Sequence, residues 1–206
     1  MKQFFKDQEV INIRSTIFGA LFILSCAVIF VQFLAYNEHR SLNYGFEFID
    51  PAFDVIPAYN VSIPIFFVTY GSLLLYLIAF RKDKELLSRI MMTYGFLILF
   101  RMISLSILPL SPPSDIIFLE DPFLNTFIYP GRIDTDLFFS GHTALLLAIY
   151  FSSGRKWYFL LLAITLGILL MIQRCHYSID ILGALPFAYF ASRLTDHYLE
   201  RWPFRV

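Results

Sequence analysis

The sequence predicts an all-α membrane protein: one bundle of six transmembrane helices with both termini in the cytoplasm. Its composition, six long apolar runs and the distribution of Lys and Arg lead to this prediction. Of the 206 residues, 58% are hydrophobic and 16% are charged, whereas soluble domains carry about 25% charged residues. A soluble domain of this size has no interior large enough to bury so much apolar surface. Equal numbers of basic and acidic residues, without a basic stripe, exclude a nucleic-acid partner.

Six apolar runs each approach the roughly 20 residues that a helix needs to cross a bilayer. In chain order they are Ile17–Tyr36, Val61–Phe80, Ile90–Leu108, Leu137–Ser153, Tyr158–Ile172 and Ile179–Thr195. The first run is longer than the apolar region of a signal peptide, and no small-residue cleavage site follows it, so we expect it to remain as a span. No repeat or Pro/Gly/Ser-rich linker divides the chain, so residues 1–206 are expected to form one membrane domain.

Lys and Arg predict the orientation, because loops rich in these residues stay in the cytoplasm. Twelve of the 16 fall at the termini or in the second and fourth loops: Lys2, Lys6, Arg14, Arg81, Lys82, Lys84, Arg89, Arg155, Lys156, Arg193, Arg201 and Arg205. The opposite side has three, which are Arg40, Arg132 and Arg174. The connections Asn37–Asn60 and Pro109–Asp136 then face outward, together with the turn around His176. We therefore expect a multi-pass protein with its polar site on the outer face.

Two short polar segments, each with a histidine, interrupt the apolar sequence. The first is Asp136-Leu-Phe-Phe-Ser-Gly-His-Thr143, which opens the fourth run, and the second is Arg174-Cys-His-Tyr-Ser-Ile-Asp180, which opens the sixth. The fourth and fifth runs form a hairpin that returns the chain to the same membrane face. Either histidine alone would be interpreted as an interfacial side chain, but His142 and His176 at one face, with an aspartate, indicate chemistry.

The spacing within these segments predicts phosphoryl transfer. On a helix, His176 and Asp180 share one face, where the carboxylate fixes the tautomer and leaves the other ring nitrogen as a base or nucleophile. Ser140 and Gly141 precede a helix whose free N–H groups and positive dipole end favour a bound phosphate. A protonated His142 beside that phosphate would donate a proton to the departing oxygen.

Four residues keep alternative interpretations. Asp136 is a candidate substrate-binding residue, although a structural hydrogen bond at the helix end is the favoured interpretation. His176 and Asp180 also have the spacing of a two-histidine, one-carboxylate metal site, but Ser-Gly before the other histidine suits an anion better, so no metal is expected. Arg101 lies inside the third run, where charges face the bundle interior or a wet cavity. Its guanidinium either binds the substrate phosphate through two parallel hydrogen bonds, pairs with an acidic residue, or extends to the membrane interface.

At the two polar segments the sequence resembles the sphingomyelin synthase family, within the superfamily of type 2 phosphatidic acid phosphatases. The segment from Asp136 is similar to the family's Asp-aromatic/apolar-Ser-Gly-His-Thr block, and the segment from His176 to its His-Tyr-Thr-(Ile/Val)-Asp block. The segment beginning at Arg101 resembles the arginine-led third-span block more loosely, and the similarity extends roughly from residue 100 to 193. The phosphatases' Lys-x6-Arg-Pro block is absent and Leu170 replaces their arginine six residues before the histidine, which favours the synthase-like branch.

The resemblance implies a cofactor-free and metal-independent enzyme that moves a phosphocholine, phosphoethanolamine or related headgroup. His176 would attack the phosphorus of a phospholipid donor, with Asp180 orienting it, and His142 would protonate the leaving diacylglycerol and then deprotonate the acceptor. The acceptor would be ceramide or diacylglycerol. A lipid phosphate phosphatase or phospholipase C-like hydrolase, with water as acceptor, is the first alternative, and a non-catalytic lipid-binding or transporting bundle is the second. Polar residues clustered at one face disfavour the second, and the oligomeric state stays open.

Overall fold

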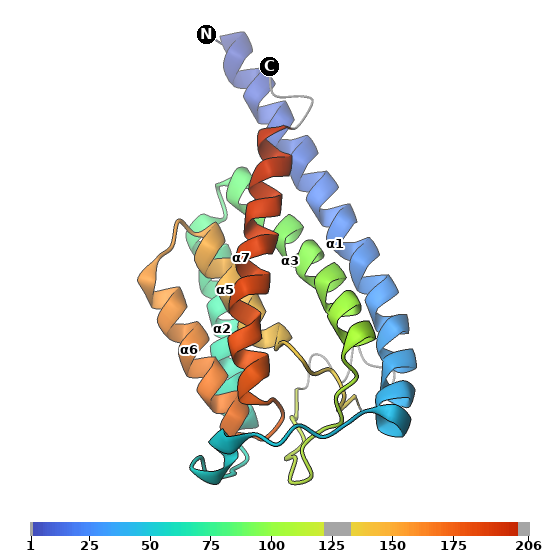
Figure 1. The fold of residues 1–206 in the computed structure, drawn as a ribbon. Helices are drawn as coiled ribbons and strands as arrows, with labels where there is room; N and C mark the ends of the chain where they lie inside the picture. The colour runs from blue at the N-terminus through green and yellow to red at the C-terminus, as the bar shows by residue number, and fades with distance from the viewer. Residues whose placement is uncertain (1, 122–132, 202–206) are drawn as a thin grey trace.

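The computed structural model describes residues 2–121 and 133–201 of the chain. Within that part it has six α-helices, one short 3-10 helix and no strand. The elements are α1 (Lys2–Tyr44), η1 (Pro51–Asp54), α2 (Ser62–Phe80), α3 (Lys84–Ile107), α5 (Gly141–Ser152), α6 (Trp157–Ile172) and α7 (Ser178–Glu200). The helices run up and down in an elongated bundle (Figure 1). The predicted all-α fold is thus confirmed for the described residues.

Each predicted apolar run forms one helix, but several helix ends differ from the prediction because capping residues decide where helices begin. The third helix begins at Lys84, since the Asp83 side chain accepts a hydrogen bond from the Leu86 amide at 3.0 Å. The fourth run becomes helical only at Gly141, since the Ser140 hydroxyl accepts from the Thr143 amide at 3.3 Å. The four preceding residues are therefore free to form an irregular segment at the site.

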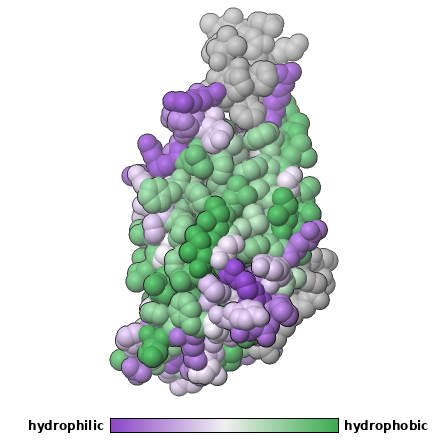
Figure 2. All heavy atoms as spheres, turned by 45° about the vertical axis from the view of Figure 1, so that its right-hand side comes forward, coloured by the Kyte–Doolittle hydropathy of each residue, from purple (hydrophilic) through white to green (hydrophobic). Residues whose placement is uncertain are grey.

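Much of the surface of the bundle is apolar. Large side chains such as Phe67, Leu182 and Trp157 are 67%, 73% and 72% exposed. On the face drawn in Figure 2, hydrophobic side chains form a broad band and hydrophilic ones gather toward the ends. Residues Ile13–Tyr44 of α1, together with α2 and α3, are long and apolar enough to cross a membrane, and α5 and α6 are shorter apolar helices. Apolar surface of this extent indicates a helical membrane protein.

The two ends of the bundle are built differently (Figure 1). The start of α1, the end of α7 and the α2–α3 and α5–α6 connections lie at one end, and η1 and the irregular segments around it cover the other. At this second end Arg40 of α1 donates to the carbonyl oxygens of Leu105 at 2.6 Å and Ser106 at 2.9 Å, which ties α1 to the end of α3. The predicted connection Pro109–Asp136 reaches this end, and its residues 122–132 lie outside the described part of the chain.

Helix α5 is the central element of the bundle. Its side chains Ala144, Leu146, Ala148 and Ile149 are all fully buried among the neighbouring helices. A helix enclosed in this way is held in place, because a shift would disturb the close packing of these side chains. Its first turn carries His142, so the core fixes the position of one of the two candidate catalytic histidines.

Candidate active site

His176 and Asp180 lie at the turn between α6 and α7, and the expected contact between them is present. The Nδ1 atom of His176 is 3.1 Å from Oδ2 of Asp180. The pair forms across the helix start rather than along one helical turn, because His176 precedes the first residue of α7. Asp180 is the third residue of that helix, and its Oδ2 also accepts from the backbone N–H of the capping residue Tyr177 at 3.0 Å. The capping interaction therefore aims the carboxylate at the histidine.

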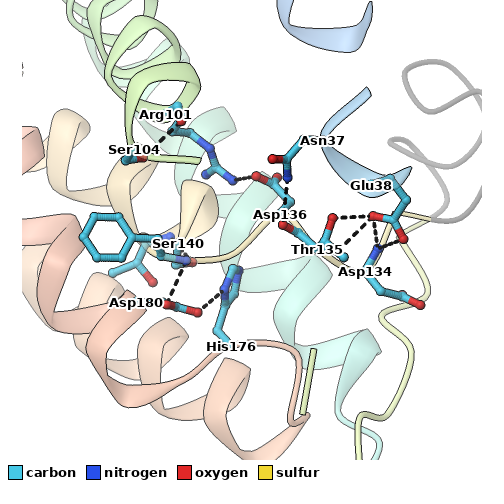
Figure 3. Close-up of polar contacts among 12 residues, drawn as sticks. Asn37, Glu38, Arg101, Ser104, Asp134, Thr135, Asp136, Ser140, His176 and Asp180 are labelled. Atoms are coloured by element: carbon cyan, nitrogen blue, oxygen red, sulfur yellow. Dashed lines mark hydrogen bonds and ion pairs between the residues drawn. The ribbon is translucent and has the colours of Figure 1, made fainter. Parts of the chain in front are cut away.

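The Asp180 carboxylate joins the two polar segments of the sequence (Figure 3). It is fully buried, and its Oδ1 accepts from the Phe138 amide at 2.9 Å, while its backbone carbonyl accepts from the Ser140 amide at 3.0 Å. Phe138 has a φ of 88°, a conformation that bulky residues rarely adopt.

Since a carboxylate only accepts hydrogen bonds, Nδ1 of His176 carries the proton and Nε2 is the nitrogen left for chemistry.

Ser140 and Gly141 have structural roles at the start of α5. The Ser140 hydroxyl caps the helix, and Gly141 makes room for the side chain of Arg101. A Cβ atom added at Gly141 would lie 1.7 Å from Nη1 of Arg101. The sequence did not indicate this reason for the glycine, because Arg101 belongs to a helix 40 positions earlier in the chain.

Arg101 is buried, 5% exposed, and its guanidinium forms an ion pair with Asp136. The same guanidinium lies 5.4 Å from the ring centre of Phe139 and 5.6 Å from that of Phe30, within the range of cation–π attraction. Of the three interpretations of Arg101 drawn from the sequence, this geometry corresponds to pairing with an acidic residue. It also gives Asp136 a structural partner, as favoured for that residue from the sequence.

The end of α1 holds the segment that carries Asp136 (Figure 3). The Glu38 carboxylate accepts from the Thr135 amide at 3.0 Å, from the Thr135 hydroxyl at 2.6 Å and from the Asp134 amide at 3.2 Å. The Asn37 side chain donates to the Thr135 carbonyl at 3.3 Å. These contacts span almost 100 positions of sequence, so nothing in the local pattern predicted them. They fix Asp136 in reach of Arg101.

His142 has an acidic neighbour that the sequence did not predict. Its Nε2 lies 3.7 Å from Oδ2 of Asp121, a residue that is 4% exposed. The Tyr70 hydroxyl of α2 donates to the same carboxylate, at 3.1 Å from Oδ1 and 3.0 Å from Oδ2. Asp121 has no regular spacing from His142, and the acidic Glu120-Asp121 pair in an otherwise apolar stretch was the one signal that pointed to it.

The two histidines meet at a small polar cavity of about 70 Å³. Its polar lining comes from Asp121, Asp134, Asp136, His142 and His176. Convergence of the two polar segments on one site is thus observed.

Cys175 also lines this cavity, and its thiol lies 3.5 Å from the Leu170 carbonyl oxygen. Burial raises the pKa of the Cys175 thiol, so the sulfur stays protonated and contributes no negative charge.

A larger apolar cavity of about 370 Å³ lies among α1, α2, α3 and α5, within the size range of ligand pockets. Most of its lining is aliphatic or aromatic, including Phe30, Leu73 and Ile98. Asp136 and His142 line both this cavity and the polar one. The site therefore combines a polar cavity with two histidines and an adjoining space for an apolar group.

Among the described residues, no three His, Cys, Asp or Glu side chains are grouped so as to hold a metal ion. The chain matches no family model, curated protein or solved structure in comparisons with known proteins. The function is therefore inferred from the geometry of the site.

Proposed function

We propose that this protein is a lipid phosphotransferase that moves a phospho-headgroup of the phosphocholine or phosphoethanolamine type from a phospholipid to ceramide or diacylglycerol. One observation carries the proposal: His142 and His176 line the same polar cavity, and a buried carboxylate, Asp180, fixes His176 so that Nε2 is available. Paired histidines of this kind supply a nucleophile and a proton carrier without a cofactor.

In the proposed reaction, Nε2 of His176 attacks the phosphorus of the donor headgroup. A nitrogen–phosphorus bond forms while the bond from phosphorus to the glycerol oxygen breaks, and His142 gives its proton to that oxygen to release diacylglycerol. His142 then takes the proton from the acceptor hydroxyl, whose oxygen attacks phosphorus and breaks the nitrogen–phosphorus bond. Both histidines return to their starting state. Asp180 stabilises the positive charge that His176 acquires in the first step.

The apolar cavity supports a lipid as substrate. It adjoins the polar cavity, and His142 lines both, so a lipid with its chain in the apolar space would place its ester oxygen beside the proton donor. Arg101 lines the apolar cavity near the same boundary, and we propose that it contacts the substrate phosphate. Arg101→Lys keeps the charge but loses the bidentate fork, so this variant should fold and turn over donor more slowly. Normal turnover would leave Arg101 with its structural pairing alone.

We also propose that all six helices span the membrane, with both termini in the cytoplasm and the site on the outer face. The start of α1 and the end of α7 lie at the same end of the bundle (Figure 1), which an even number of spans requires. The basic α2–α3 and α5–α6 connections share that end, in agreement with the tendency of Lys and Arg to stay in the cytoplasm. An outward site at the membrane surface lets both lipid substrates remain in the bilayer.

Hydrolysis is the second candidate, because the polar cavity of about 70 Å³ has the room and the polar lining to hold water. Purified protein in vesicles with a headgroup-labelled phospholipid, with and without ceramide or diacylglycerol, separates the candidates by lipid chromatography. Label on the added acceptor supports transfer, and label released into water supports hydrolysis. His176→Ala is the matched inactive control. Label that stays on the donor under every condition would overturn the proposal.

A further inference from the structure

The polar cavity has a second histidine–carboxylate pair, which the proposed mechanism does not yet use. We infer that Asp121, held by Tyr70, is the positioning residue for His142. It serves the proton-transferring histidine as Asp180 serves the nucleophile. The inference rests on the proposed function and deepens it, because it adds two residues to the machinery of proton transfer.

The three side chains come from three separate parts of the fold. His142 is in the first turn of the buried helix α5, Tyr70 is in the middle of α2, and Asp121 is in the segment after α3. The Tyr70 hydroxyl lies 3.1 and 3.0 Å from the two carboxylate oxygens and so fixes the plane of the Asp121 carboxylate. The carboxylate, 4% exposed, in turn lies 3.7 Å from Nε2 of His142.

The side chains of His142, Asp121 and Tyr70 lie where the proposed reaction moves a proton. Asp121 lines the polar cavity, Tyr70 lines the apolar cavity, and His142 lines both. The oxygen that leaves the headgroup belongs to the lipid part of the donor, so it lies at the boundary between the two cavities. A carboxylate at ion-pair distance stabilises the imidazolium that forms when the acceptor hydroxyl loses its proton.

A purely structural role for Asp121 would be to tie its segment to α2 through Tyr70, and the leaving group of the donor distinguishes the two roles. A phospholipid donor releases a basic alkoxide that needs a proton, whereas a nitrophenyl ester of phosphocholine releases a stable phenolate that does not. Loss of a positioning residue for the acid affects the first reaction much more than the second. A structural defect affects both equally.

The test uses Asp121→Asn and Tyr70→Phe, with the neighbouring exposed Glu120→Gln as the matched control. With phospholipid donor, Asp121→Asn should lower kcat about 10- to 100-fold at little-changed KM, below the 10²–10⁴-fold typical of a whole general acid. With the nitrophenyl donor, the single-turnover rate of nitrophenolate release, which needs no proton from His142 and precedes deprotonation of the acceptor, should fall less than about threefold. Tyr70→Phe should show the same pattern more weakly, so it still tests the inference if Asp121→Asn does not fold. Glu120→Gln should match the wild type with both donors.

A double variant completes the test. If Asp121 acts through His142, adding Asp121→Asn to His142→Ala should cause no further loss, since residues that act as a unit are not additive. Three results would each overturn the inference while leaving the proposed function intact. They are equal losses with both donors, additive losses in the double variant, and unchanged activity of Asp121→Asn. A wild-type protein that uses neither donor would overturn the proposed function and the inference together.

Discussion

Replacing Gly141 by alanine tests the buried contact between α3 and α5 most directly. The added Cβ would lie 1.7 Å from Nη1 and 2.7 Å from Cζ of Arg101, whereas real Cβ atoms do not come within 3.0 Å of a neighbour. The Nη1 atom would therefore have to retreat by the difference between 3.0 and 1.7 Å, which is 1.3 Å. Two aromatic rings and the Asp136 carboxylate lie against this guanidinium, so the retreat disturbs these contacts.

The expected cost follows from known effects of overpacking. Inserting a methyl group into a well-packed interior costs about 1–3 kcal/mol, and losing one partner of a buried ion pair costs about 3–5 kcal/mol. Arg101 is displaced and keeps a partner, so we expect a loss of about 1–3 kcal/mol. For a chain of this length each kcal/mol lowers Tm by about 2–4 °C, so Gly141→Ala should lower Tm by roughly 2–12 °C.

Thermal unfolding in detergent micelles measures this loss, and the chain provides a matched control. Gly71 of α2 has nothing within 4 Å of an added Cβ, so Gly71→Ala should be neutral or stabilising by up to about 1 kcal/mol through helix propensity. In an Arg101→Met background the extra loss from Gly141→Ala should shrink, since the clashing guanidinium is gone. A Gly141→Ala protein as stable as the wild type, or an unchanged increment in that background, would refute the steric reasoning.

Three further outcomes are expected. His176→Ala should abolish phosphate labelling of the protein by any donor. His142→Ala should lose about 10²–10⁴-fold of the activity with phospholipid, and a nitrophenyl donor should partly restore that activity. Phosphate mapped to His142 by mass spectrometry would reverse the two roles. Activity should survive EDTA, because the proposed mechanism uses protein groups alone; loss restored by a divalent cation would favour a metal site. Single cysteines at Glu120 and Lys84 should react with an impermeant reagent from outside and from inside respectively, and the opposite pattern would invert the proposed topology.

The sequence predicted the helices well because lipid and core impose the same demand for long apolar runs. It also predicted that His142 and His176 converge, since two apolar runs separate them and return the chain to the same end. The contact of His176 with Asp180 was predicted for a slightly different reason, as both were placed on one helical face. In the structure Asp180 reaches back across the helix start, and a capping interaction produces the same proximity.

The supporting contacts could not be predicted, because they join irregular segments far apart in the chain. Asp121 reaches His142 only because the segment after α3 folds over the end of the bundle. Glu38 orders the segment before Ser140 through backbone amides, which carry no sequence signal at all. Such contacts depend on the path of the chain in space, and periodicity reports only the local conformation.

The two cavities that share His142 determine how this site would meet its substrates. In the proposed activity, lipid chains would reach the apolar cavity by lateral diffusion within the membrane, and not from the aqueous phase. For the proposed activity, the relevant concentration is then the mole fraction of donor and acceptor in the bilayer. Diluting the substrates with an inert phospholipid should slow the reaction, whereas diluting the vesicles with buffer should leave the rate per protein unchanged.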